Sequence, residues 1–463
     1  LDSSSTLIAD GAPLQFGTEW AAMGSGSLQF DSATTMFGGV AGDTANAMAA
    51  GQAAGKLVIV LPGQPTSMAG LLSSAQAMAP GATAVAILVP PAFINFAKEP
   101  SMYVDDGAAT PDEPESLTLF ISPSAVQKLL GKTIAQLVPG TEGAAASANA
   151  RVIVAPVEFP ARNVVAVLPG SDPAVSGEYV AIGAHNDHVG FNTSPVDHDS
   201  LRIFNHIVRP GGAEDQGARA TRAQMTEVNE ALAAWRTEHP GTQRLDSIFN
   251  GADDDGSGSV TVLEIAQHLA SLPEKPRRSI LFVWHVGEEK GLLGSEYFTD
   301  HPTVPRDSIV AQLNMDMVGR GNVWDVTGAT KSGEVLRGGD DYLQLVGSRR
   351  LSTELGDLIE QVDSVGAFGL KFDYSMDADG HPMNIYCRSD HYEYARYGIP
   401  VAFFTTGGHS DYHQLTDEPQ YIDFAHMARI GNFVSAVALQ IANLDHRIVV
   451  DQPVPDPHGS CRQ

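Results

Sequence analysis

The sequence predicts an α/β protein with a mixed, mostly parallel sheet that carries helices on both faces, joined to a second, smaller α/β region. Three observations predict this fold class. Apolar strand-like runs alternate with amphipathic helix-like runs. The strand-like runs are short and almost uniformly apolar, as expected for strands covered on both faces. The chain has 463 residues, which is enough for two to three domains.

The smaller region comes first along the chain. After a Gly-, Ser- and Thr-rich start, residues 55–63 (GKLVIVLPG) read as a buried strand that ends in a Pro-Gly turn. Residues 68–82 form an amphipathic helix, residues 83–90 a second apolar strand, and a further strand and helix follow over 117–132. Residues 141–150 (TEGAAASANA) are small and polar and read as a linker. Together these runs predict a β-α-β unit followed by a domain boundary.

The larger region begins near residue 151. Its expected strands and helices alternate, with a polar and partly helical stretch over residues 192–250 that reads as an insertion. The expected strands are 157–170, 177–188, 277–287, 308–319 and 399–407, and the expected helices include 261–272 and 290–301. This alternation predicts the covered, mixed sheet.

Charge and hydropathy exclude some classes of partner. The chain has 28 Lys and Arg against 55 Asp and Glu, a formal net charge of −27. An acidic surface repels phosphate backbones, so nucleic acid is not an expected partner. No apolar run reaches the roughly 18–20 residues that a membrane-spanning helix needs. Neither property decides the oligomeric state.

Two cysteines, Cys387 and Cys461, lie too far apart for a CxxC site. They form either one disulfide that fastens the C-terminal tail or two free thiols, and the sequence leaves both open. The chain begins at Leu1 without an apolar leader, which is consistent with a removed signal segment and hence with a secreted or periplasmic protein.

Imidazole and carboxylate side chains gather where the expected strands end. His185 and Asp187 end one strand, Glu288 and Glu289 another, and Asp316 a third; His413 lies shortly after the strand over 399–407. In open α/β sheets ligands bind outside the carboxyl ends of the strands. A mixture of imidazole and carboxylate ligands is typical of zinc, and carboxylates crowded at a buried rim would be costly without a cation.

One stretch also fits a different metal. Residues 253–264 (DDDGSGSVTVLE) match the spacing of an EF-hand calcium loop, with Asp253 and Asp255 early and Glu264 at the closing position. A calcium-binding module therefore stands as an alternative of a different class. It needs a helix before the loop, where RLDSIFNGA is a poor candidate, and a paired second loop, which the sequence does not offer. Calcium is possible but is not the predicted cofactor.

Six motifs in sequence order resemble the co-catalytic zinc exopeptidase family, which includes bacterial leucyl aminopeptidases and glutamate carboxypeptidase. They are HNDHVG, GADDDGSG, GEEKGLLGS, NMDMVGR, RSDHYEYARYGIPVAFFTTG and DYHQLTDEP, and they cover roughly residues 150–445. Residues from about 20 to 150 resemble the protease-associated domain often inserted in such enzymes. The resemblance implies a peptidase domain over 1–20 and 151–463, interrupted by a protease-associated domain over 21–150.

The resemblance also implies two zinc ions and the residues that hold them. His185 and Asp316 would hold one ion, and Glu289 and His413 the other. Asp254 would bridge both, with Asp253 and Asp255 as the candidates if the register slips. A cis peptide bond is expected just after the bridging aspartate; without proline such a bond costs about 3–4 kcal/mol.

Two acidic residues are left for the chemistry. Glu288 stands beside a ligand but cannot face the same way, so it is the expected general base for a zinc-activated water. Asp187 is expected to accept the N–H of the His185 imidazole and fix its tautomer. His188, His285 and His409 are expected to be structural or to lie near the site without binding metal.

The expected activity is hydrolysis of peptide bonds next to a free terminus, by an aminopeptidase in the first place. A carboxypeptidase of the same family is the closest rival, because the metal cluster is the same in both. Arg388, Tyr386 and His391 are the candidate substrate-binding residues, and Arg388 could equally pair with an acidic neighbour. The insertion over 192–250 is longer than in many family members and is expected near the site.

Overall fold

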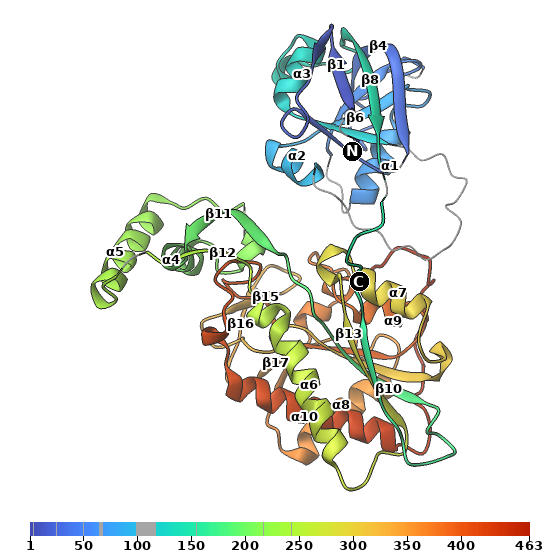
Figure 1. The fold of residues 1–463 in the computed structure, drawn as a ribbon, viewed down its shortest axis with the longest axis vertical. Coiled ribbons are helices and arrows are strands. Elements are labelled where there is room, and N and C mark those ends of the chain that lie inside the picture. Colours follow the sequence, from blue (N-terminus) through green and yellow to red (C-terminus); the bar gives the residue numbers. More distant parts are fainter. Residues whose placement is uncertain are drawn as a thin grey trace. The chain divides into compact units, whose positions relative to one another are not determined.

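The computed structural model describes residues 1–463 except residues 3, 25, 50, 64–67, 99–116, 154, 216 and 242. The chain divides into two compact units, Leu1–Pro160 and Ala161–Gln463, and Figure 1 shows the elements of both. Each unit has its own sheet and its own apolar core.

The first unit is built on an eight-stranded mixed sheet. Its four central neighbours, β4 to β7, are parallel, and the strands outside them are antiparallel to their neighbours. Side by side, the strands are β2 (Ala12–Pro13), β1 (Thr6–Ala9), β8 (Glu142–Arg151), β4 (Ser27–Val40), β5 (Leu57–Leu61), β6 (Ala84–Leu88), β7 (Thr118–Ile121) and β3 (Trp20–Met23). The helices are α1 (Met68–Ala77), α2 (Pro91–Ala97) and α3 (Pro123–Leu130), and a 3₁₀ turn, η1 (Ile134–Gln136), follows α3.

Two expectations about this unit are wrong. Residues 141–150 are not a linker: β8 pairs with β1 on one side and with β4 on the other. The small side chains Ala146, Ala148 and Ala150 are buried in the core, and this lack of bulk is what made the segment read as a linker. Because β1 lies in this sheet, the first 20 residues belong to the first unit and not to the peptidase domain.

The sheet of the second unit is mixed, as the sequence predicts, and has seven strands. Strands β10, β13, β14 and β19 run parallel to one another, and β9 and β17 lie antiparallel beside them. Side by side, the strands are β18 (Lys371–Asp373), β17 (Tyr342–Val346), β19 (Val401–Thr405), β14 (Ile309–Met315), β10 (Tyr179–His185), β13 (Ser279–His285) and β9 (Val164–Leu168).

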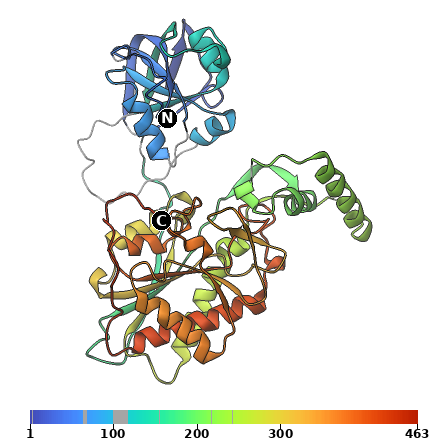
Figure 2. The same cartoon turned by 180° about the vertical axis from the view of Figure 1, so that it is seen from behind.

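Helices cover both faces of this sheet (Figure 2). One face packs against α6 (Gly258–Ser271), α8 (Thr353–Gly366) and α10 (Phe424–Asn443). The other packs against α7 (Leu293–Asp300) and α9 (His391–Ala395). Alternate residues of β10 divide between the two cores, with Val180 and Ile182 on the first face and Ala181 on the second.

The insertion forms a small subdomain within the second unit. Strands β11 (Phe191–Asp197) and β12 (Leu245–Ile248) pair antiparallel and frame α4 (His198–Val208), the short turn η2 (Gly212–Asp215) and α5 (Arg222–Glu238). α4 and α5 lie against each other, and α5 projects from the rest of the unit (Figure 1). The side chain of Asp197 caps α4, and a Thr221–Gln224 capping box starts α5.

The remaining short elements lie in the connections between these strands and helices. They are η3 (Ala252–Ser257), η4 (Glu288–Lys290), η5 (Arg306–Ser308), β15 (Val326–Ala329), β16 (Val335–Arg337), η6 (Ser375–Asp377), η7 (Ile385–Cys387) and η8 (Pro419–Tyr421). Cys387 and Cys461 form a disulfide, so of the two alternatives left by the sequence the bonded one holds. No helix in the described part of the chain is long and apolar enough to cross a membrane.

Candidate metal centre and substrate pocket

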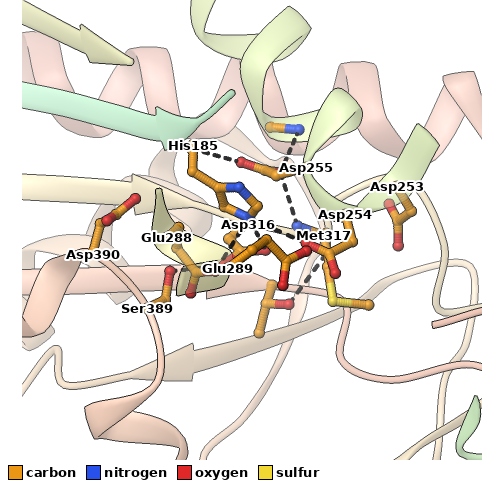
Figure 3. A network of polar contacts seen from close by, with 12 residues as sticks. His185, Asp253, Asp254, Asp255, Glu288, Glu289, Asp316, Met317, Ser389 and Asp390 are labelled. Carbon is orange, nitrogen blue, oxygen red and sulfur yellow. Dashed lines mark hydrogen bonds and ion pairs between the residues drawn. The ribbon is translucent and has the colours of Figure 1, made fainter. Parts of the chain in front are cut away.

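The expected strand-end residues meet at one rim of the second sheet (Figure 3). His185 is the last residue of β10, Asp316 directly follows β14, and Glu288 and Glu289 begin the turn after β13. β10 is flanked by β13 and β14 in parallel register, so the carboxyl ends of all three strands lie together. The sheet therefore delivers these side chains to one place, as strand position alone predicts.

Asp254 lies at the centre of the group. Its Oδ1 is 3.1 Å from His185 Nε2, and its Oδ2 is 2.9 Å from His413 Nε2. The two oxygens of one buried carboxylate thus face two different imidazoles. This is the arrangement that a bridging carboxylate needs.

Each side of Asp254 has a second carboxylate. On the His185 side, Asp316 Oδ1 is 3.7 Å from His185 Nε2, and Ser389 donates a 2.7 Å hydrogen bond to Asp316 Oδ2. On the other side, Glu289 Oε2 is 3.0 Å from His413 Nε2. The structure brings together all five residues that the sequence predicts as ligands.

His188 belongs to this group, although the sequence indicated a structural or pocket-lining role for it. Its Nδ1 is 2.8 Å from Glu289 Oε1 and 4.0 Å from Asp254 Oδ2. His188, Asp254 and Glu289 offer ligand atoms close enough to hold one ion. The signal was its position three residues after His185 in HNDHVG.

The neighbours of Asp254 hold the backbone. Asp255 accepts hydrogen bonds from the backbone N–H groups of His185, Gly258 and Met317, at 2.9–3.2 Å. Asp253 accepts one from Gly319 N–H at 2.7 Å. Asp255 also lies near His185 and Asp316 in a second possible ion-binding group, but its oxygens already accept these backbone bonds.

The turn that carries the three aspartates has the expected cis peptide bond, between Asp254 and Asp255. Glu264 lies exposed on α6 and is not part of either candidate ion-binding group. Asp253, Asp255 and Glu264 therefore do not converge on one ion, as a calcium loop requires. The EF-hand interpretation of this stretch is wrong.

Glu288 lies at the edge of the group with its carboxylate 3.9 Å from His185 Nε2. Burial raises its pKa well above the ordinary value; the nearby His185 opposes this, and the negative charges of Asp316 and Asp390 add to it. Asp187 fixes Glu288, because the Asp187 Oδ1 accepts the Glu288 backbone N–H at 3.1 Å.

Asp187 also contacts His185. The His185 imidazole Nδ1 lies closer to the Asp187 backbone carbonyl oxygen, at 3.1 Å, than to the Asp187 Oδ1, at 3.7 Å. Asp187 thus holds His185 chiefly through its backbone carbonyl and not through its side chain.

The electrostatics fit a cation at this place. Burial lowers the pKa of His413, but its hydrogen bonds with Asp254 and Glu289 outweigh this and raise the pKa to about 10. Burial likewise opposes a raised pKa at His185, but the charge of Asp316 and the hydrogen bond with Asp254 outweigh it and raise that pKa well above the ordinary value. A mixed imidazole and carboxylate set with this excess of negative charge suits divalent zinc.

Two other histidines near the site are structural. His285 pairs with Tyr394 Oη at 3.0 Å and with Asp390 at 3.3 Å. His409 Nε2 lies 3.1 Å from Asp253 Oδ2. Both agree with their expected roles outside the ligand set.

A cavity of about 430 Å³ opens beside Asp254, Glu288, Asp316 and His413. Most of its wall is apolar, and the wall includes residues of the insertion. The other lining residues are Pro210, Gly211, Glu214, Asp215, Met317, Val326, Thr327, Gly328, Ala329, Val335, Arg337, Gln344, Met376, Met383, Ile385, Arg388, Ser389, Phe403, Thr405, Gly407, Gly408 and Tyr412.

Of the three candidate substrate-binding residues, only Arg388 lines this cavity. Tyr386 is buried behind the wall, where the Arg350 guanidinium lies 4.6 Å from its ring centre. His391 stacks on Phe403 with ring centres 4.8 Å apart, and burial lowers its pKa to about 3. The structure does not support these two as substrate contacts, because η7 and the start of α9 bury both side chains.

Comparison with known proteins agrees with this geometry. Residues 163–438 match the family model described as Peptidase family M28. Leucine aminopeptidase 1 of Coccidioides posadasii is 33% identical over 203 residues, which is 42% of this chain and 47% of that protein. Leucine aminopeptidase 1 of Aspergillus oryzae is 30% identical over 202 residues, with the same shares. The chain thus spans about half the length of the curated relatives it matches.

Among solved structures, a zinc aminopeptidase from Bacillus subtilis is similar in fold. It has a TM-score of 0.50 and 17% sequence identity, and the match covers 94% of this chain and 81% of that one. The family match extends over more than half of the chain and includes every strand-end residue described above. This chain belongs to peptidase family M28.

Proposed function

We propose that this protein is a dinuclear zinc exopeptidase that hydrolyses peptide bonds next to a free N-terminus. The observation that carries the proposal is Asp254, whose two carboxylate oxygens face His185 on one side and His413 on the other. Such a carboxylate is suited to bridge two ions. His185 with Asp316 would hold the first ion, and His413 with Glu289 the second.

Zinc ions bound there would polarise the scissile carbonyl and lower the pKa of the attacking water. The chain itself supplies the proton transfer. Glu288, raised in pKa and aimed at the rim, takes a proton from the attacking water and returns it to the leaving amine. Asp187 keeps Glu288 in place by accepting its backbone N–H.

An aminopeptidase is favoured over a carboxypeptidase by two observations. The relatives that match over 203 and 202 residues are named leucine aminopeptidases. The pocket lining also carries Asp215, next to the Glu214–Arg388 ion pair, and a carboxylate there attracts an α-ammonium group and repels an α-carboxylate.

The test compares peptides whose termini are free or blocked. We expect rapid release of the first residue from a free peptide and from its C-terminal amide, and none from its N-acetylated form. Chelation should abolish the activity and zinc should restore it. Cleavage of the N-acetylated peptide from its C-terminal end would instead establish the carboxypeptidase.

A matched variant separates the chemistry from binding. Glu288→Gln should lower kcat by about 10²–10⁴-fold, the usual contribution of a general base, with the zinc content unchanged. Full activity in this variant would contradict the assignment of Glu288.

The location of the protein and the role of its first unit complete the proposal. We place the protein outside the cytoplasm, secreted or periplasmic, because its two cysteines are joined in a disulfide. Residues of the first unit would be a protease-associated domain, supported by the β-α-β arrangement of β5, α1 and β6. Peptides are the expected partners, and nucleic acid is not.

A further inference from the structure

The insertion reaches the pocket through a short segment that is fixed tightly against the loop of His413. The Ala213 backbone N–H donates a 3.0 Å hydrogen bond to the Tyr412 carbonyl. Gly212 has a positive φ of 59°, and a Cβ there would lie 2.6 Å from that carbonyl oxygen and 2.8 Å from the His409 carbonyl. The backbone of the insertion therefore contacts the backbone of the His413 loop directly at this point. This contact fixes the chain just before Glu214.

Glu214 uses that position to pair with Arg388. Arg388 Nη2 lies 2.7 Å from Glu214 Oε1 and 3.1 Å from the Tyr412 hydroxyl oxygen. Both Glu214 and Arg388 line the cavity, and their side chains are 39% and 37% exposed. The guanidinium therefore faces the pocket with its charge already compensated.

Besides Glu214, the mostly apolar lining carries four further carboxylates. Asp215 lies next to Glu214, and Asp254, Glu288 and Asp316 lie at the metal end. Arg337 is the other arginine of the lining and lies on β16, where its Nη1 donates to the Trp324 carbonyl. Of the two arginines among the described lining residues, Arg388 is thus the one whose guanidinium can meet a substrate carboxylate, and Glu214 occupies it.

We propose that Glu214 is a specificity-determining residue: by pairing with Arg388 it makes the pocket reject acidic side chains and free carboxylates, and accept neutral residues. This inference rests on the proposed peptidase activity. It assigns a function to the insertion, which supplies the selective carboxylate from outside the sheet. Removing the charge of Glu214 frees Arg388 to bind a carboxylate.

The experiment measures kcat/KM for the p-nitroanilides of glutamate and of leucine, and uses their ratio. Glu214→Gln should raise the glutamate-to-leucine ratio by about tenfold or more, the factor of a charge-assisted hydrogen bond. Glu214→Ala should act in the same direction. Free glutamate should inhibit both variants more strongly than it inhibits the wild type, a readout that does not depend on turnover.

Two controls isolate the pair. Arg388→Gln combined with Glu214→Gln should return the ratio to the wild-type value, because the freed cation is gone. Arg236→Gln breaks another ion pair of the insertion, 3.0 Å from Asp197 and outside the cavity lining, and should leave the ratio unchanged.

The outcomes distinguish this inference from the proposed function. An active wild type whose ratio is unchanged or lowered by Glu214→Gln overturns the role of Glu214 and leaves the peptidase intact. A wild type that hydrolyses no peptide or anilide with zinc present overturns the proposed function, and this inference with it.

Discussion

Three consecutive aspartates in η3 show how position decides the role of a side chain. Asp253 and Asp255 accept backbone N–H groups from segments on either side, which fixes the turn. Asp254 between them faces the imidazoles of His185 and His413. The outer two hold the turn in place so that the middle one faces both imidazoles.

This arrangement predicts opposite effects at two acidic residues. Asp254→Asn should cost most of the bound zinc, because the neutral amide compensates neither ion. Glu264→Gln should retain all of it, since Glu264 is exposed on α6. Metal analysis of the dialysed proteins measures both. Loss of metal in Glu264→Gln together with full retention in Asp254→Asn would restore the calcium-loop interpretation.

Because the His391 imidazole is buried, we expect the free energy of unfolding to depend on pH. Its pKa is about 3 in the folded protein because it is buried, against about 6.5 when unfolded. Between these values the unfolded chain binds more protons, so the free energy of unfolding falls as the pH drops from 6.5 towards 3.

The measurement compares the wild type with His391→Leu in urea unfolding at pH 7.5 and pH 5.0. Between the two pH values the wild type should lose about 2 kcal/mol more than the variant. The comparison cancels other groups that titrate in both proteins. An equal loss in both would show that His391 is protonated in the folded state.

At the scale of elements, the C-terminal tail fastens the wall of the pocket. The disulfide joins Cys461 to Cys387, the residue before Arg388. Gln463 accepts the Tyr386 backbone N–H at 3.0 Å, and its own N–H donates to Asn384 at 3.1 Å. The tail therefore holds the segment that presents Arg388.

The variant Cys387→Ser/Cys461→Ser should lower the free energy of unfolding by about 2–4 kcal/mol, the usual contribution of a disulfide that closes a long loop. KM should rise more than kcat falls, because Glu288 and the predicted ligands lie outside this segment. Chemical denaturation and steady-state kinetics measure the two effects. A variant with unchanged stability would show that the bonds of Gln463 hold the tail without the disulfide.

The site residues at the ends of the strands were the easiest to predict from the sequence. His185, Asp316 and the Glu288–Glu289 pair follow apolar runs, and parallel strands bring such ends together whatever the loops do. His188 was missed as a member of the group because its contact with Glu289 depends on how the loop after β10 turns. β8 was missed because its alanines carry no strand-like bulk, and the pairing that makes it a strand comes from β1 and β4.

For the whole molecule, the division into two units predicts where activity resides. Every predicted ligand and every residue lining the cavity lies within 161–463. A chain of residues 161–463 should therefore fold, bind zinc and hydrolyse leucine p-nitroanilide with kcat/KM within a few-fold of the full chain. Circular dichroism and the anilide assay measure this. A folded, zinc-loaded fragment without activity would show that the first unit takes part in the reaction.

The contact between Gly212 and the Tyr412 carbonyl has a consequence for engineering and for evolution. The segment that shapes substrate choice rests on the backbone beside His413, so the two cannot be exchanged independently. A graft that replaces the insertion to obtain a new selectivity would also change how firmly the second ion is retained. A homologue with a different insertion is then expected to differ at this contact as well.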